Sequence, residues 1–200
     1  MIVSRTVAQR KQGIPVSRWI DHGFDSGAAG HEEHRPGGPC YAVSVGRFYS
    51  RAELRKQRAV WKQEGKTVVF TNGCYDLLHP GHVRLLEQAR SMGSILILAL
   101  NSDVSVQRMK GPSRPVIAEA ERAEMAVALE AVDAVTLFDE ETPRELIGFV
   151  LPDVLVKGAD WSHFIAGREE VEAAGGKVLT VALEPGYSTT NIVERILSQP

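Results

Sequence analysis

Short apolar runs alternate with stretches of helical periodicity along most of this chain. The apolar runs lie at residues 68–70, 95–100, 134–138, 153–156 and 177–183. Such runs are typical of strands that are buried on both faces of a parallel sheet. Helical patterns lie at residues 50–64, 80–89, 119–130, 142–150, 168–174 and 188–197, with a shorter one at 104–106. This alternation predicts an α/β fold, a Rossmann-like doubly wound parallel sheet of about five strands.

Residues 1–47 differ from the rest of the chain. They are rich in glycine and proline over 26–39 and show no sustained apolar period there, so we expect an N-terminal extension that is disordered or loosely packed. The segment 31–34, His-Glu-Glu-His, does not have the spacing of a helical zinc motif, and no metal site is predicted there. A capping box at Ser50 and Glu53 opens the first helix. Thr142 and Pro143 are expected as the cap and first residue of a later one. We place the folded domain at residues 48–200.

Composition excludes several classes of function. The formal net charge is −2, so no general basic field predicts binding to nucleic acid or a membrane surface. No apolar run reaches the roughly 18 residues of a membrane span, and the N-terminus lacks the apolar segment of a signal peptide. The two cysteines, Cys40 and Cys74, are far apart and give neither a disulfide framework nor a zinc spacing. We therefore expect a cytoplasmic protein.

Chemistry-bearing residues cluster just after the predicted strands. Residues 72–82, 101–103, 157–160 and 186–190 all follow one, and ligands of parallel α/β sheets bind beyond the carboxyl ends of the strands. In 79–82, His-Pro-Gly-His, two histidines lie at a helix N-terminus, where backbone N–H groups and the helix dipole favour a phosphate. The alternatives are one capping and one core histidine, or a zinc site, for which no third ligand has the right spacing.

These stretches together resemble the HxGH nucleotidyltransferases of the cytidylyltransferase-like superfamily. The match begins with 71–76, Thr-Asn-Gly-Cys-Tyr-Asp, and the HxGH residues 79–82. It continues through 101–106, 108–111, 114–115, 142–143, 152–160 and 186–190, so that the likeness runs from about 48 to 197. More narrowly, the chain resembles the adenylyltransferase domain that makes ADP-heptose from D-glycero-β-D-manno-heptose 1-phosphate. The sugar-kinase domain often fused ahead of that domain has no counterpart here, so a separate heptose kinase is expected.

The resemblance implies a reaction and a set of site residues. A sugar 1-phosphate would attack the α-phosphorus of ATP, with Mg²⁺ brought by the nucleotide and no metal site made by the protein. The implied catalytic residues are His79, His82 and Lys110. The implied nucleotide-binding residues are Thr71, Asn72, Gly73, Cys74, Gly81, Gly158, Asp160, Tyr187, Ser188, Thr189 and Thr190. Weaker candidates for substrate contacts are Asp76, Asn101, Asp103 and Arg122.

Plainer interpretations stay open for several of these residues. Lys110 and Arg122 could be solvated surface residues, the 188–190 segment could be a simple helix cap, and Asp76 and Asp103 could only cap local structure. Cys74 is expected to contribute its small size and backbone N–H rather than a nucleophile.

The sequence also departs from the heptose family. Ala159, Trp161 and Ala166 replace a usual Gly, Tyr and Val, and the first two border the expected base pocket. Glu130 stands where the glycerol-phosphate branch has an arginine, which counts against that branch. A cytidylyltransferase for a polyol or glycerol phosphate and a non-catalytic nucleotide-binding module remain the alternatives. A homodimer is left open.

Overall fold

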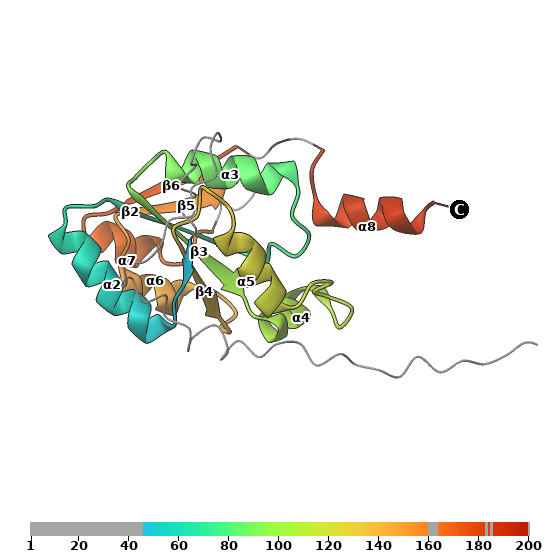
Figure 1. Cartoon of the computed structure of the whole chain (residues 1–200), viewed down its shortest axis with the longest axis horizontal. Coiled ribbons are helices and arrows are strands. Elements are labelled where there is room, and N and C mark those ends of the chain that lie inside the picture. The colour runs from blue at the N-terminus through green and yellow to red at the C-terminus, as the bar shows by residue number, and fades with distance from the viewer. Residues whose placement is uncertain (1–45, 160–163, 183, 185, 200) are drawn as a thin grey trace, which may run out of the picture. The chain divides into compact units, whose positions relative to one another are not determined.

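Six parallel strands form one sheet within the part of the chain that the computed structural model describes, residues 46–159, 164–182, 184 and 186–199 (Figure 1). Its order is β1-β4-β3-β2-β5-β6, and every neighbouring pair is parallel. The predicted doubly wound parallel sheet is confirmed, with one strand more than expected. The strands are β1 Arg47–Phe48, β2 Val68–Gly73, β3 Ile95–Asn101, β4 Ala134–Phe138, β5 Val154–Gly158 and β6 Lys177–Val181.

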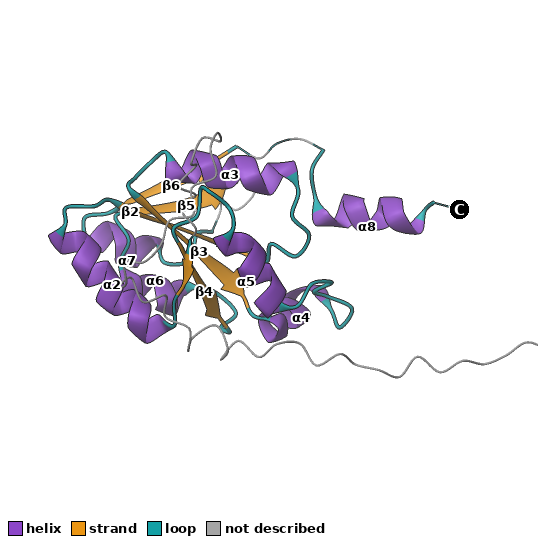
Figure 2. Cartoon of the chain, in the orientation of Figure 1, coloured by secondary structure: helices purple, strands orange, loops and turns teal. Residues whose placement is uncertain are grey.

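Helices cover both faces of this sheet (Figure 2). They are α2 Arg51–Gln63, α3 Pro80–Arg90, α4 Asp103–Lys110, α5 Glu119–Val127, α6 Arg144–Val150 and α7 Arg168–Ala173. A further helix, α8 Thr189–Leu197, extends away from the sheet (Figure 1). Side chains of α2, α6 and α7 are buried in one apolar cluster, and those of α3 and α5 in another on the opposite face. The chain runs outward from β2 to β4 and then returns to β5, on the other side of β2. This reversal between β2 and β5 is the topological switch point at which such sheets bind ligands.

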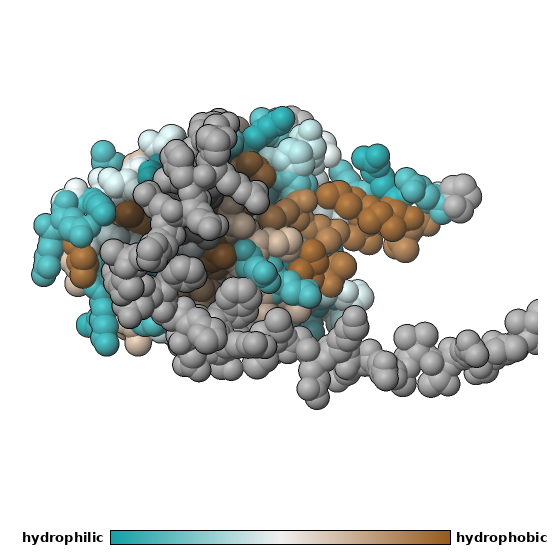
Figure 3. Space-filling model, in the orientation of Figure 1, coloured by the Kyte–Doolittle hydropathy of each residue, from teal (hydrophilic) through white to brown (hydrophobic). Residues whose placement is uncertain are grey.

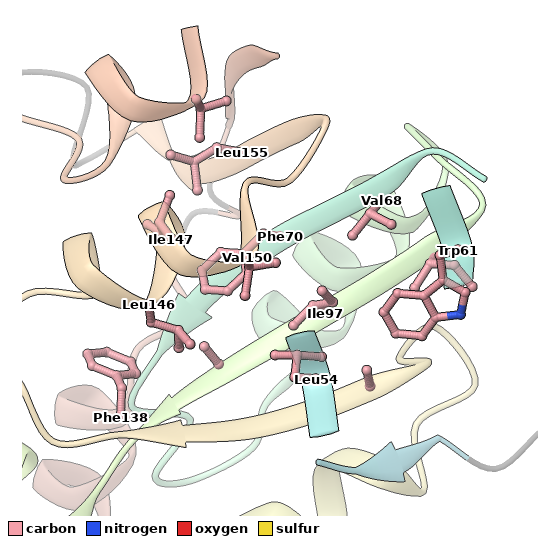
Figure 4. Close-up of a cluster of buried hydrophobic side chains, with 14 of the residues drawn as sticks. Leu54, Trp61, Val68, Phe70, Ile97, Phe138, Leu146, Ile147, Val150 and Leu155 are labelled. Carbon is pink, nitrogen blue, oxygen red and sulfur yellow. The ribbon is translucent and has the colours of Figure 1, made fainter. Parts of the chain in front are cut away.

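The core explains why the central strands read as continuous apolar runs. All seven residues of β3 are buried, and the first four of β2 are too. Figure 4 shows the cluster beneath α2 and α6, in which Leu54 and Leu146 are buried together with Phe70 and Ile97 from the sheet. Trp61 at the end of α2 makes an edge contact with the Tyr49 ring at a centroid distance of 6.1 Å. Two buried faces fix the sheet and thereby the positions of the loops at its carboxyl edge.

The start of α2 agrees with the sequence, and the start of α6 does not. Ser50 and Glu53 form the predicted capping box, in which the Glu53 carboxylate accepts the Ser50 N–H at 2.9 Å. The N-cap of α6 is Pro143, and no side chain caps that helix. The prediction that Thr142 caps α6 was therefore wrong, because the helix begins one residue later than the Thr-Pro pattern suggests.

An acidic side chain connects two strands at their amino-terminal ends, away from the carboxyl ends. Asp153 stands just before β5; one carboxylate oxygen accepts the Val68 N–H at 2.7 Å, and the other lies 2.9 Å from an Arg58 guanidinium nitrogen. This contact satisfies a backbone donor at the start of β2, far along the strands from their carboxyl ends.

On the face that Figure 3 shows, apolar side chains gather on α8. Helix α8 buries none of its residues, and Ile196 and Leu197 are 63% and 79% exposed (Figure 3). No helix of the described residues is long and apolar enough to cross a membrane. The predictions for residues 1–45, including His31 to His34 and Cys40, lie outside the described residues, as do those for Asp160 and Trp161.

Candidate active site

The junction between β2 and α3 brings two imidazoles together at a helix start. His79 is the N-cap of α3 and Pro80 its first residue, as the sequence predicts. The His79 Nδ1 accepts the backbone N–H of His82 at 3.3 Å, so the proton of a neutral His79 ring lies on Nε2. The two imidazole rings stack at a centroid distance of 3.7 Å and an interplanar angle of 15°. This geometry presents both rings as one unit.

Gly81 allows this close packing. A Cβ at Gly81 would lie 3.1 Å from His79 Nδ1 and 3.1 Å from Tyr187 Cβ. The Tyr187 ring stacks beyond His79 at 6.2 Å, and the Tyr75 ring lies 4.6 Å from that of His82. A side chain at Gly81 would push these groups apart, which explains why the motif has glycine here.

Burial keeps both imidazoles uncharged near neutral pH. Loss of hydration, together with electrostatic repulsion from His79 and Lys110, lowers the pKa of His82 to about 4. Burial also lowers the pKa of His79. Neutral imidazoles still offer N–H donors, and a bound polyanion would favour their protonated forms. The pair therefore suits hydrogen bonding to phosphate oxygens.

Lys110 approaches the histidines from a different element. It is the last residue of α4, and the chain turns away at Gly111, whose φ of +91° suits a residue without a side chain. Lys110 and His82 line the same pocket, and the charge of Lys110 helps to lower the pKa of His82.

A second helix N-terminus faces the same space. Ser188 caps α8, and its Oγ accepts the Asn191 N–H at 3.0 Å. The first residues of α8, Thr189 and Thr190, add two hydroxyl groups and free backbone N–H groups. Such a terminus favours an anion.

The carboxyl ends of β2, β3 and β5 form the floor. Lys157 of β5 donates to the Asn72 Oδ1 at 2.8 Å, and the Asn101 amide donates to Ser105 Oγ at 3.0 Å. The Cys74 thiol lies 3.8 Å from the Asn101 Oδ1. The first contact joins β5 to β2, the second joins β3 to α4, and the third joins β3 to the residue after β2, so the floor is held in one arrangement.

Most of the predicted residues line a single pocket of about 400 Å³. The three catalytic candidates and ten of the nucleotide-binding candidates belong to its wall, together with Asn101. In chain order they are Thr71, Asn72, Gly73, Cys74, His79, Gly81, His82, Asn101, Lys110, Gly158, Tyr187, Ser188, Thr189 and Thr190. The structure thus brings together groups from β2, α3, α4, β5 and α8.

Three weaker candidates lie outside that wall. Asp76 and Arg122 are 1% exposed, and their polar atoms are taken up by neighbouring loops. Asp103 pairs with Arg122 at 2.8 Å. Asp76 and Asp103 follow strands as expected and Arg122 lies on α5, but the side chains of all three contact the protein rather than the pocket.

Sequence reasoning missed several lining residues. Glu141, Thr142 and Phe164 line the pocket but were not among the candidates, and Lys157, which lies in the predicted stretch 157–160, was given no role. Lys157 is the penultimate residue of β5, and the segment 141–142 follows β4, so the rule that ligands bind at carboxyl strand ends was the available signal.

Known proteins are similar to this chain in sequence. The bifunctional protein HldE of Syntrophotalea carbinolica is 53% identical over 150 residues, which are 74% of this chain and 31% of that protein. The HldE of Bradyrhizobium sp. strain ORS 278 is 54% identical over 147 residues, 73% of this chain and 30% of that protein. The chain therefore spans about a third of the length of these curated relatives.

Solved structures share the fold. A lipopolysaccharide core biosynthesis protein from Thermoplasma volcanium GSS1 superposes with a TM-score of 0.50 and 26% identity, covering 60% of this chain and 98% of that one. A pantoate–beta-alanine ligase from Francisella tularensis gives a TM-score of 0.51 at 12% identity, covering 78% of this chain and 80% of that one, which shows the fold alone. The family profile described as Cytidylyltransferase-like matches residues 70–195, and this chain belongs to that family.

Proposed function

We propose that this chain is an adenylyltransferase that transfers AMP from ATP to D-glycero-β-D-manno-heptose 1-phosphate, giving ADP-heptose and pyrophosphate. The observation that carries the proposal is the convergence of the His79–His82 pair, Lys110 and the N-terminus of α8 on one pocket. Each of these groups stabilises phosphate oxygens. The choice of sugar and base rests on the resemblance to the ADP-heptose-forming domain and on identities of 53–54% to HldE proteins.

The reaction requires positioning rather than a covalent intermediate. A phosphate oxygen of the sugar 1-phosphate attacks the α-phosphorus of ATP and forms the new P–O bond. The bond from the α-phosphorus to its bridging oxygen breaks, and that oxygen keeps the electron pair as pyrophosphate leaves. The attacking phosphate is already ionised at neutral pH, so no general base is needed. In-line geometry and electrostatic stabilisation then supply the rate.

The histidines act as hydrogen-bond donors in this scheme. His79 offers its Nε2–H, because its Nδ1 is occupied by the His82 N–H. Their lowered pKa values keep the pair neutral until the phosphates arrive. Lys110 supplies the positive charge at the reacting phosphate, where negative charge from both substrates meets. The α- and β-phosphates therefore lie over α3.

The remaining lining residues would hold the nucleotide. Ser188, Thr189 and Thr190 suit the β- and γ-phosphates at the start of α8. The backbone at 71–74 and Gly158 would border the ribose and base, and the resemblance implies the same role for Asp160, which lies outside the described residues. Ala159, in place of the family's usual glycine, follows Gly158 directly and is the departure that bears most on the choice of base.

Mg²⁺ is expected to enter with ATP. Across the described ranges, no three or more His, Cys, Asp or Glu side chains come close enough to hold a metal ion. The groups beside the histidines are donors and a cation, which fit phosphate oxygens, so those oxygens would be the ion's main ligands. When bound, the ion would offset charge on the phosphates and on the departing pyrophosphate.

The test is pyrophosphate release by purified protein with ATP, Mg²⁺ and heptose 1-phosphate. His82→Ala should lower kcat by about 10²-fold or more, because it removes a transition-state donor. Gln88→Ala, an exposed position on the same helix, is the matched control and should behave as wild type. Unchanged turnover in His82→Ala would exclude this mechanism. Tight ATP binding without pyrophosphate release from any sugar 1-phosphate would favour the non-catalytic alternative.

A cytidylyltransferase is the second candidate, and the family description favours it. Parallel assays with ATP and CTP, each with heptose 1-phosphate and glycerol 3-phosphate, separate the two. Turnover with CTP and none with ATP would replace the first proposal.

The proposed reaction also implies partners. The sugar 1-phosphate must come from a kinase reaction, which we expect a separate heptose kinase to carry out, and ATP supply places the reaction in the cytoplasm. We expect no contact with nucleic acid or membrane. A homodimer is testable by light scattering of the purified chain.

A further inference from the structure

The loop at residues 111–118, which connects α4 to α5, is held by the carboxylate of Asp76, in the segment between β2 and α3 that carries His79. The Asp76 Oδ2 accepts the Arg114 Nε–H at 2.6 Å, and Arg114 Nη2 lies 2.6 Å from the same oxygen. The Asp76 Oδ1 accepts the backbone N–H groups of Val116 at 2.7 Å and Ile117 at 3.0 Å. The Asp76 side chain is fully buried and that of Arg114 is 14% exposed. One carboxylate thus anchors one loop at three residues.

A buried guanidinium completes the connection. Arg122 of α5 donates through Nε to the Ile117 carbonyl at 3.0 Å, through Nη1 to the Cys74 carbonyl at 2.6 Å, and through Nη2 to Asp103 at 2.8 Å. Its side chain has no exposed surface. It therefore joins the loop that leads to His79, the first turn of α4 and the 111–118 loop.

Breaking the buried contacts of Asp76 or of Arg122 would cost a large amount of free energy. Burial acts to raise the pKa of Asp76, but hydrogen bonds from Ile117, Arg114 and Val116 outweigh it, so the pKa is lowered and the carboxylate is ionised. Removing one partner of a buried charged pair leaves the other charge without compensation. The arrangement is held as a unit.

Lys110 lies between the two anchors. It ends α4, whose first residue is Asp103, and it directly precedes the loop that Asp76 holds. Asp76 lies only three residues before His79. The segment that carries the histidines and the segment that carries Lys110 are therefore tied by buried charged contacts, although they lie about thirty residues apart in the chain.

We propose that Asp76 and Arg122 are positioning residues that fix Lys110 opposite the His79–His82 pair, an inference that rests on the proposed transfer reaction. Neither side chain touches the pocket, so their effect acts through Lys110. A displacement of about 1 Å at a reacting group can cost roughly 10²-fold in rate. The two residues hold the lysine against such displacement.

Asp76→Asn is the sharpest variant. It keeps the shape of the side chain and an acceptor for Val116 and Ile117, but it removes the charge and can turn an amide toward Arg114. We expect kcat to fall by about 10²-fold with a smaller change in KM for ATP. In the Lys110→Ala background the same substitution should cost less than about 3-fold, since the lysine it positions is gone. An equal loss in both backgrounds would overturn the proposal.

A second readout is independent of catalysis. Trypsin should cleave after Lys110 faster in Asp76→Asn than in wild type, because the following loop is released. Arg114→Gln is less buried, breaks the same contact from the other side, and serves if Asp76→Asn does not fold. Unchanged cleavage at Lys110 in either variant would refute the anchor.

Asp153→Asn is the matched control. It also removes a carboxylate that pairs with an arginine and accepts a backbone N–H, but at the amino-terminal ends of the strands, far from the pocket. It should lower the free energy of unfolding while leaving kcat and cleavage at Lys110 as in wild type. If wild type shows no transfer with any nucleotide, the proposed function fails, and the proteolysis arm still decides whether the anchor exists.

Discussion

Acid titration of His82 tests the electrostatics of the pocket without a substrate. In the unfolded chain this side chain has the ordinary histidine pKa of 6.5, and in the folded protein burial, His79 and Lys110 lower it to about 4. As pH falls, the unfolded state therefore binds a proton first. Titration of His82 therefore lowers the free energy of unfolding as pH falls below 6.5, and this decrease levels off near pH 4.

The size of this loss follows from the shift. At 1.36 kcal/mol per pKa unit, a change from 6.5 to about 4 corresponds to roughly 3 kcal/mol, and partial exposure of the ring reduces it to about 1–2 kcal/mol. Urea unfolding of wild type and His82→Gln between pH 8 and pH 4 measures this loss as the difference between the two proteins. The carboxylates titrate in both proteins, so their effect cancels in that difference. The two stabilities should converge or cross as pH falls.

A direct measurement accompanies the unfolding experiment. Histidine ring protons followed by NMR should show one resonance, absent in His82→Gln, that titrates far below pH 6.5. A resonance with an ordinary histidine pKa, together with parallel unfolding curves for the two proteins, would refute the assignment of a buried, neutral imidazole. A non-hydrolysable ATP analogue should move the titration upward, because phosphate charge favours the protonated ring.

Three further perturbations test separate parts of the structure. Gly81→Ala places a Cβ 3.1 Å from both His79 Nδ1 and Tyr187 Cβ, so pyrophosphate release should fall by about 10-fold or more, in keeping with the cost of misplaced reacting groups, with little change in Tm. Ser188→Ala removes the cap of α8 and should cost about 1 kcal/mol of helix stability, seen as a raised KM for ATP. Leu54→Ala opens a cavity under a fully buried side chain and should lower the free energy of unfolding by about 2–5 kcal/mol in urea titrations.

The sheet was predictable because its central strands are buried on both faces. Each residue of β3 is apolar except the last, and the short length of this run favours a buried strand over a buried helix. β1 was missed because two residues carry no periodicity; only its pairing with β4 defines it. The cap of α6 was misjudged for a related reason, since helix ends depend on local backbone angles that a Thr-Pro pair does not fix.

The residues that line the pocket were largely predictable from the sequence, but the buried contacts that hold them in place were not. Topology alone places residues after parallel strands on one edge, which is why His79, Asn101 and Gly158 meet. Topology does not say which way a side chain points. Asp76 follows β2 as the rule for ligand contacts requires, and Arg122 lies on α5, yet the partners of both lie about forty residues or more away along the chain, in the 111–118 loop and at Cys74. Local sequence carries no signal for contacts at that separation.

The protein has a net negative charge, yet its pocket suits a polyanion. Short-range interactions within the pocket account for this difference. Two of its donors are neutral imidazoles, and the fields of the helix N-termini fall off within about the first turn. Such groups attract a phosphate only at contact distance. Recognition then depends on how exactly spaced the donors are, so buried residues that set the spacing, Asp76 and Arg122, matter for the reaction as much as the groups that line the pocket.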